Sequence, residues 1–264
     1  MEAVVFENVN KVFARGEVAA EDVSFSIRKG EFVFVIGRSG AGKSTLLRLM
    51  SAQERTTSGR IWVNGQELDR IPEKKMPYFR RQIGVMQSDL GLLDDRTLFD
   101  NVYLSVIATE QQGRKGKRRV ESLLRAMGII DRARFYPREV SMGEAARALL
   151  ARAMVIGPSI LIADEPTANL DPDASWDLMC LLTELNRQGI TVVVASHNQE
   201  LVSIMRRRVI TLSAGRLVAD EKNAVYNVRA ADAMEERRIL HEREYRKQNG
   251  TLPDHSDRGG GQPE

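Results

Sequence analysis

The chain has 264 residues, of which 28% are charged and 42% hydrophobic, a composition that is ordinary for a globular protein and long enough for one domain of about 220 residues with a tail. The formal net charge of +3 is too small to indicate nucleic-acid binding, and a single cysteine, Cys180, excludes an internal disulfide. We expect no membrane span and no signal peptide, so any membrane role should come from a partner.

The first part of the chain is predicted to form strands. Ala3–Val9 and Val23–Ile27 alternate apolar with polar residues, as half-buried antiparallel strands do. The apolar run Glu31–Ile36 is predicted to be a buried strand, whereas Thr45–Met50 is predicted to be helical. Farther on, Ile61–Val63 indicates a strand that enters a turn.

A glycine-rich loop connects the buried strand to the helix. It consists of Gly37, Arg38, Ser39, Gly40, Ala41, Gly42, Lys43 and Ser44, with Thr45 next in the chain. Such a loop binds phosphate because glycines let backbone N–H groups converge and the helix points its positive end at the anion. We expect Lys43 to reach the β- and γ-phosphates and Ser44 to bind Mg²⁺. A flexible surface turn is the alternative, but the order of elements favours binding of a nucleoside triphosphate.

The middle of the chain changes from strand to helix. Ile83–Met86 indicates a short strand that ends at Gln87, and the pattern is helical from about Leu98 to Ala153. The basic run Arg114–Arg119 interrupts this pattern. It could bind phosphates or anionic lipid headgroups, but the start of a solvated helix is the favoured interpretation.

Strands return in the last third of the domain. They are predicted at Ile160–Ala163, Thr191–Ala195 and Val209–Leu212, with helices between them. Alternating strands and helices predict an α/β fold with a mainly parallel sheet and helices on both faces.

Two acidic residues end the first of these strands. Asp164 is predicted to be a magnesium ligand, and Glu165 is predicted to act on the water that attacks the γ-phosphate, as a general base or by positioning it. The alternative, the start of a solvated loop, is weakened by the glycine-rich loop earlier in the chain.

From Lys222 onward the chain is highly charged, and we expect residues 222–264 to form an extension that is partly helical and then disordered. Ala230–Gln248 is expected to form a marginal, charged surface helix. A role for this helix in binding a partner stays open.

Six motifs between about Ala3 and Ala219 resemble, in their order, those of ATP-binding-cassette (ABC) ATPases. They are the glycine-rich loop, Gln87, Ser141–Glu144, the pair Asp164 and Glu165, Asn169–Asp171, and His197. Within this superfamily the chain resembles the FtsE family, the ATPases of the bacterial cell-division complex FtsE–FtsX. That narrower resemblance rests on Leu92–Val102, Ile162–Asp171 and Val209–Ser213.

The resemblance implies the fold of an ABC ATPase domain over residues 1–221. This fold has a P-loop core with a mainly parallel sheet, an antiparallel β subdomain, and a helical signature subdomain at about residues 88–157. It also implies that Phe13 stacks on adenine, although a core phenylalanine is the alternative. Gln87 would contact Mg²⁺ or the attacking water, and His197 would hydrogen-bond the γ-phosphate.

The resemblance further implies a head-to-tail homodimer with two ATP molecules between the subunits. Each ATP would contact Ser141 and Gly143 of the opposite chain, and Asp171 would help to join the two protomers. Here the signature motif has Met142 where the family usually has glycine. If this position requires a positive φ, methionine is strained there, which predicts slow hydrolysis that Met142→Gly raises.

These features together predict an ATPase at the cytoplasmic face of the inner membrane. It would drive an integral membrane partner resembling FtsX, and so control peptidoglycan hydrolysis in cell division. The partner is expected to contact Gln87–Asn101, where Leu90, Leu92, Leu93 and Phe99 are apolar in what otherwise looks like an exposed loop. The alternatives are the ATPase of an exporter or lipoprotein-extraction system, and an ATP-gated scaffold with little hydrolysis.

Overall fold

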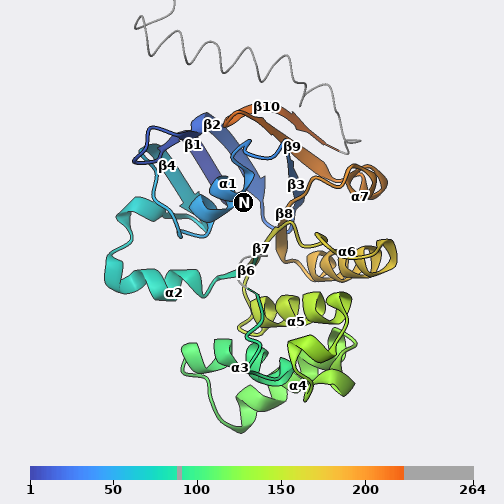
Figure 1. The fold of residues 1–264 in the computed structure, drawn as a ribbon. Helices are drawn as coiled ribbons and strands as arrows, with labels where there is room; N and C mark the ends of the chain where they lie inside the picture. The colour runs from blue at the N-terminus through green and yellow to red at the C-terminus, as the bar shows by residue number, and fades with distance from the viewer. Residues whose placement is uncertain (88–90, 223–264) are drawn as a thin grey trace, which may run out of the picture.

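The computed structural model describes residues 1–87 and 91–222, which form two sheets with helices between and around them (Figure 1). The helices α3, α4 and α5 lie at the lower end of the molecule in this view. The expected charged helix at Ala230–Gln248 lies outside the described residues. No helix in the described ranges is long and apolar enough to cross a membrane.

The larger sheet has six strands in the order β10-β9-β3-β8-β7-β6. Its strands are β3 (Phe32–Ile36), β6 (Ile83–Gln87), β7 (Ile160–Asp164), β8 (Thr191–Ala195), β9 (Arg208–Ser213) and β10 (Arg216–Glu221). All neighbouring pairs are parallel except β9 and β10. The central strands β3, β7 and β8 are buried along their whole length and mostly apolar, because both faces of the sheet are covered. The prediction of a mainly parallel sheet is confirmed.

The smaller sheet is antiparallel, with the order β2-β1-β4-β5. Its strands are β1 (Glu2–Val12), β2 (Val18–Arg28), β4 (Ser58–Val63) and β5 (Gln66–Glu67). Buried and more accessible residues alternate along parts of β1 and β2, as the sequence predicts for strands with one face on the core.

The helix α1 (Lys43–Met50) joins the two sheets into one core. Its buried Leu46 and Leu47 pack in a cluster that includes Val4 of the small sheet and Val33 of the large one. This packing fixes the direction of α1, and therefore the position of the glycine-rich loop that precedes it.

The opposite face of the large sheet is covered by the remaining long helices. These are α3 (Leu98–Ala108), α4 (Arg114–Ala126), α5 (Met142–Met154), α6 (Pro172–Arg187) and α7 (Gln199–Met205). Phe32 and Phe34 point to this face and share a cluster with Leu178 of α6 and Val102 of α3. The short α2 (Met76–Arg80) and the 3₁₀ turns complete the chain; the turns are Leu68–Arg70, Glu73–Lys75, Ile130–Arg132 and Pro137–Glu139.

Candidate functional site

The carboxyl ends of four adjacent parallel strands bring the predicted catalytic residues together. The glycine-rich loop follows β3, His197 comes just after β8, and the Asp164–Glu165 pair ends β7. On the edge strand β6, Gln87 is directly opposite Asp164. Parallel pairing therefore gathers side chains from four separate segments at one edge of the sheet.

The glycine-rich loop requires glycine at two positions. Gly37 has φ +151°, and a Cβ there would lie 2.4 Å from the carbonyl oxygen of Leu212. Gly42, the N-cap of α1, has φ +100°, and a Cβ would lie 2.3 Å from the carbonyl oxygen of Ala19. These close approaches show that the loop has room only for bare backbone, as a phosphate cradle needs.

The other loop residues complete this cradle. Arg38, Ser39 and Gly40 form its exposed tip, Ala41 is buried, and Ser44 and Thr45 lie half-buried in the first turn of α1. That first turn contains no acidic residue, so the positive end of the helix is not neutralised from within the helix.

Lys43 lies almost entirely buried at the centre of the site. Its Nζ donates hydrogen bonds to the carbonyl oxygens of Gly37 at 2.9 Å and Arg38 at 3.1 Å. The same Nζ lies 4.0 Å from a carboxylate oxygen of Glu165. A buried ammonium group that contacts both the loop and the acid after β7 is positioned to neutralise phosphate.

Glu165 connects this lysine to His197. Its Oε2 lies 2.7 Å from Nδ1 of His197 and accepts a bond from the backbone N–H of the same residue at 3.3 Å. The Glu165 backbone has φ +50°, and its N–H donates to Ala195 at 3.0 Å. This left-handed turn directs the carboxylate back over the strand ends.

Two polar atoms beside Glu165 are buried without a hydrogen-bond partner among the described residues. They are Oδ1 of Asp164 and Nε2 of Gln87, on side chains that are about nine-tenths or more buried. Burying such atoms unpaired costs free energy, so they indicate a polar ligand. The oxygen atoms of the Asp164 carboxylate, the Gln87 amide and the Ser44 hydroxyl in the first turn of α1 are ligands that suit Mg²⁺.

The signature segment forms the start of α5. Ser141 is the N-cap: its Oγ accepts from the N–H of Glu144, whose carboxylate accepts from the N–H of Ser141. This backbone hydrogen bond holds the pKa of Glu144 below its ordinary value, and Arg132 lowers it further. Gly143 packs closely, since a Cβ there would lie 3.0 Å from Cβ of Ala174.

Met142 is the first residue of α5 and is 61% exposed. It does not belong to the non-glycine residues with positive φ. The condition on which the predicted strain depended is therefore not met, and methionine fits this helical position without backbone strain. Asp171 is the N-cap of α6, where its Oδ1 accepts from the N–H of Ala174 at 2.8 Å.

Phe13 follows β1 and is half-buried, outside the two hydrophobic clusters. Nζ of Lys11 lies 4.8 Å from the centre of its ring and is held by Glu54 at 2.9 Å. The sequence reasoning missed Lys11. Lys11 lies two residues before Phe13, at the end of β1, and this spacing was the available signal.

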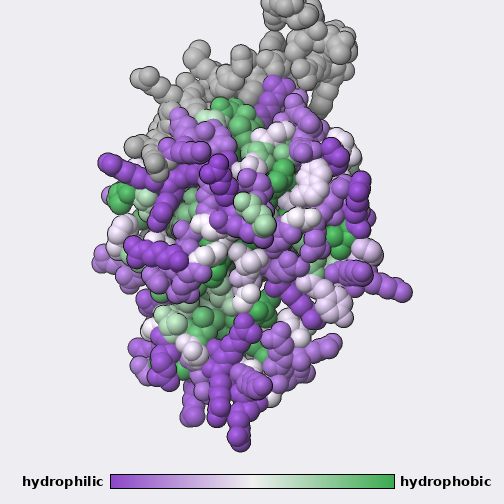
Figure 2. Space-filling model, turned by 180° about the vertical axis from the view of Figure 1, so that it is seen from behind, coloured by the Kyte–Doolittle hydropathy of each residue, from purple (hydrophilic) through white to green (hydrophobic). Residues whose placement is uncertain are grey.

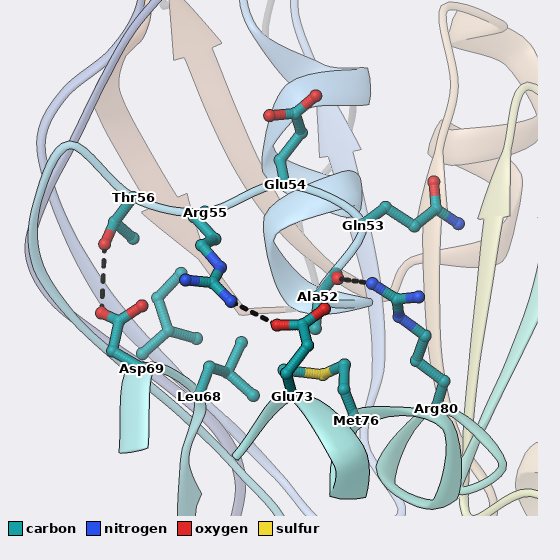
Figure 3. Close-up of a pocket in the computed structure, with 11 residues that line it drawn as sticks. Ala52, Gln53, Glu54, Arg55, Thr56, Leu68, Asp69, Glu73, Met76 and Arg80 are labelled. Carbon is teal, nitrogen blue, oxygen red and sulfur yellow. Dashed lines mark hydrogen bonds and ion pairs between the residues drawn. The ribbon is translucent and has the colours of Figure 1, made fainter. Parts of the chain in front are cut away.

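A small cavity of about 80 Å³ lies next to this region, under the loop that follows α1 (Figure 3). Polar groups that line it bind one another: Arg55 pairs with Glu73 at 2.6 Å, and the Thr56 hydroxyl donates to Asp69 at 3.2 Å. Arg80 donates to the Ala52 carbonyl oxygen at 2.7 Å. These bonds hold the loop that carries Glu54 in place, and the cavity is not part of the candidate site.

The apolar residues predicted to contact a partner divide into two kinds. Leu92 and Phe99 pack against the main hydrophobic cluster, whereas Leu93 is 46% exposed; Leu90 lies outside the described residues. Leu93 borders an open groove of about 660 Å³ between β6 and the helices α3 and α5. The groove is lined by Ile83, Gly84, Val85, Gly91, Leu92, Leu93, Leu104, Ser105, Ala108, Arg152, Ala153 and Ile156.

Comparison with known proteins agrees with the interpretation of the strand-end residues as a nucleotide-binding site. Residues 20–168 match the family described as ABC transporter. The cell division ATP-binding protein FtsE of Bacillus subtilis is 41% identical over 223 residues, which span 84% of this chain and 98% of the relative. FtsE of Escherichia coli is 42% identical over 212 residues, 80% of this chain and 96% of the relative. The dimeric structure of the ATP-binding cassette MJ0796 bound to ADP and phosphate has a TM-score of 0.76 at 30% identity, covering 84% of this chain and 99% of that one.

Proposed function

Because this chain belongs to the ABC transporter family of ATP-binding proteins, and within it to the FtsE branch, we propose that it is the ATP-hydrolysing subunit of a membrane complex resembling FtsE–FtsX that acts in cell division. The observation that carries this proposal is the set of contacts joining Lys43, Glu165 and His197 at the carboxyl edge of the sheet. The similarity does not favour the alternatives that the sequence left open, which are an exporter or lipoprotein-extraction ATPase and an ATP-gated scaffold with little hydrolysis.

ATP is the substrate, and each residue has a separate role. The loop amides and Lys43 bind the phosphates. The Glu165 carboxylate accepts a proton from the water that attacks the γ-phosphorus, and ADP is the leaving group. When both ring nitrogens of His197 are protonated, Nδ1 donates to Glu165 and Nε2 can donate to a phosphate oxygen.

Asp164, Gln87 and Ser44 are the residues that would hold Mg²⁺. A magnesium ion at this position neutralises negative charge on the phosphates. The unpartnered Oδ1 of the buried Asp164 supports this assignment, whereas the unpartnered Nε2 of Gln87 is a donor that suits a phosphate oxygen or the attacking water and leaves Oε1 as the possible ligand.

We place two copies of the chain head to tail around two ATP molecules. The start of α5, with Ser141 and Gly143, would present N–H groups and the positive helix end to the ATP bound by the partner, while Asp171 lies at the start of α6 near the same surface. Phe13, braced by Lys11, would stack on the adenine base of the subunit's own ATP.

A permease-like partner resembling FtsX would hold the ATPase at the cytoplasmic face of the inner membrane. The groove beside Leu93 supports this placement because it is mainly apolar, open, and formed by both the edge strand β6 and the helical end of the molecule. A helix of the partner in this groove would sense movement of Gln87 at the end of β6.

The catalytic assignment is tested by two substitutions. Lys43→Ala should weaken ATP binding, because it removes positive charge that binds the ground-state phosphates. Glu165→Gln should leave binding intact and lower turnover about 10²-fold or more, because it removes the base. Nucleotide titration and phosphate release measure the two effects. Turnover of Glu165→Gln at the wild-type rate would remove Glu165 from the mechanism.

The partner site is tested by Leu93→Glu, with Ile204→Glu as the matched control. Both side chains are about half exposed, but Ile204 lies on α7, far along the chain from the groove. Leu93→Glu should abolish co-purification with the membrane partner and leave ATP titration unchanged, whereas Ile204→Glu should change neither. Loss of both functions in Leu93→Glu would show that Leu93 belongs to the core.

A further inference from the structure

The helix α4 exposes a dense positive charge that the ATPase mechanism does not use. Its apolar side is buried, with Val120 and Leu124 at 0% exposure. Its exposed basic residues are Arg114, Lys115, Lys117, Arg118, Arg119 and Arg125, and Glu121 is the one acidic residue of the helix. The sequence prediction that the basic run begins a solvated helix is confirmed.

This charge is not neutralised by nearby acids. Within residues 1–87 and 91–222, no ion pair involves Lys115, Lys117 or Arg118, while Arg119 donates to the neutral amide of Gln111 at 3.2 Å. Figure 2 shows hydrophilic side chains gathered over the lower end of the molecule, where α3, α4 and α5 lie. Since the whole chain has a net charge of only +3, the positive charge here is a local concentration.

The first turns of α4 lie beside the groove described above. The guanidinium of Arg119 is so close to Gly157 that a Cβ there would lie 2.6 Å from Nη2, and the preceding residue, Ile156, lines the groove. At another part of the rim, Arg81 donates to the carbonyl oxygen of Ala108, also a groove residue, at 3.4 Å. Positive charge therefore reaches the groove from two separate segments.

Exposed apolar side chains accompany these cations. The ring of Tyr78 is 63% exposed, with the guanidinium of Arg81 4.7 Å from its centre, and Ile107, in the last turn of α3, is 44% exposed. Tyrosine, arginine and lysine with a few exposed aliphatic groups are typical of surfaces that lie at the headgroup level of a bilayer.

We propose that this basic rim, defined as Arg81, Lys115, Lys117, Arg118 and Arg119, rests on anionic lipid headgroups. Its orientation toward the membrane rests on the proposed function, because the groove beside it is the proposed partner site. The charge complementarity does not depend on that function. Lipid is favoured over nucleic acid because the cations flank an apolar groove and are accompanied by Tyr78 and Ile107.

The test uses the full-length protein without its partner. Vesicles of phosphatidylcholine, alone or with about 30% phosphatidylglycerol, are sedimented with wild type at about 0.1 M and about 1 M salt. The test variant reverses two exposed charges, Lys115→Glu with Arg118→Glu. The control makes the same change in charge elsewhere, Arg187→Glu with Arg206→Glu, on exposed residues of α6 and of the turn after α7.

Wild type and control should bind the anionic vesicles at the lower salt and release them at the higher one. The test variant should bind at least about tenfold less, since each basic residue near an anionic surface strengthens binding about fivefold. Equal binding to phosphatidylcholine alone, or equal binding by the test variant, would overturn the proposal. Displacement of wild type from vesicles by a DNA fragment at equal phosphate concentration would assign the rim to nucleic acid and also overturn it. Neither result depends on ATP turnover or on co-purification, which test the proposed function separately.

Discussion

The loop that contains Leu93 is held in place by one buried side chain, Asn101 of α3. Its Oδ1 accepts from the N–H of Leu93 at 2.7 Å, and its Nδ2 donates to the carbonyl oxygens of Leu93, Arg96 and Thr97 at 3.0–3.2 Å. The residue is fully buried, at 0% exposure. The sequence reasoning included Asn101 in the segment Leu92–Val102 that carries the FtsE resemblance and as the end of the predicted partner segment, and no pattern in the sequence indicates that its amide would turn back on the loop.

Replacing Asn101 by leucine tests this role. The change keeps a similar volume but removes every amide hydrogen bond, including the one that the N–H of Leu93 donates. The two Nδ2 hydrogens are shared among three carbonyl oxygens, so the amide makes about three full hydrogen bonds. At about 1 kcal/mol for each bond lost, we expect Asn101→Leu to lower the free energy of unfolding by about 3 kcal/mol. Because the affected loop borders the groove, co-purification with the membrane partner should fall as well.

Urea unfolding measures the loss, with Thr97→Ala as the control. Thr97 is the N-cap of the same helix, and its Oγ1 accepts one hydrogen bond, from the N–H of Asp100. Losing this single cap should cost about 1 kcal/mol. If Asn101→Leu costs no more than Thr97→Ala, the buried amide does not hold the loop, and the reasoning is refuted.

Three further predictions follow from the site. Gly42→Ala should abolish ATP binding, as measured by nucleotide titration. The added Cβ would lie 2.3 Å from the Ala19 carbonyl oxygen, at a residue whose φ is +100°. Binding near wild-type strength would show that the loop can shift. Met142→Gly should change phosphate release by less than about twofold, because no backbone strain is relieved; a several-fold increase would revive the sequence-based prediction. Glu144→Gln should destabilise the protein at pH 7, and the difference from wild type should shrink as the pH falls below 4.5. The pKa of Glu144 is lowered in the folded state, so its carboxylate stabilises the fold above pH 4.5 and this contribution is lost as the pH falls through the lowered pKa; a difference in urea midpoint that stays constant below pH 4.5 would contradict this.

Much of the secondary structure could be predicted because its signals are local. The strands β3, β7 and β8 each contain a run of at least four consecutive apolar residues, and α1 follows a glycine-rich loop. The strand β10 was not predicted: its residues are only half-buried at one edge of the sheet, where apolar periodicity is weak. The sequence also could not predict that Leu92 packs inward while Leu93 is exposed, because two neighbouring leucines cannot be distinguished until their contacts are known.

The sequence by itself determined the identity and order of the site motifs. A strand, a glycine-rich loop and a helix in succession carry their chemistry within a dozen residues, so Lys43 and Ser44 could be assigned to phosphate and Mg²⁺ without a fold.

Only the tertiary structure decided which of these motifs touch. The strand order puts Gln87 opposite Asp164 and brings His197 within 2.7 Å of Glu165, although 77 and 32 residues separate these pairs in the chain. The structure also shows that Met142 is not strained, because the residue has an ordinary helical backbone at the start of α5. Contacts between distant segments depend on how the sheet pairs and how the helices pack, and neither is encoded in the local pattern of residues.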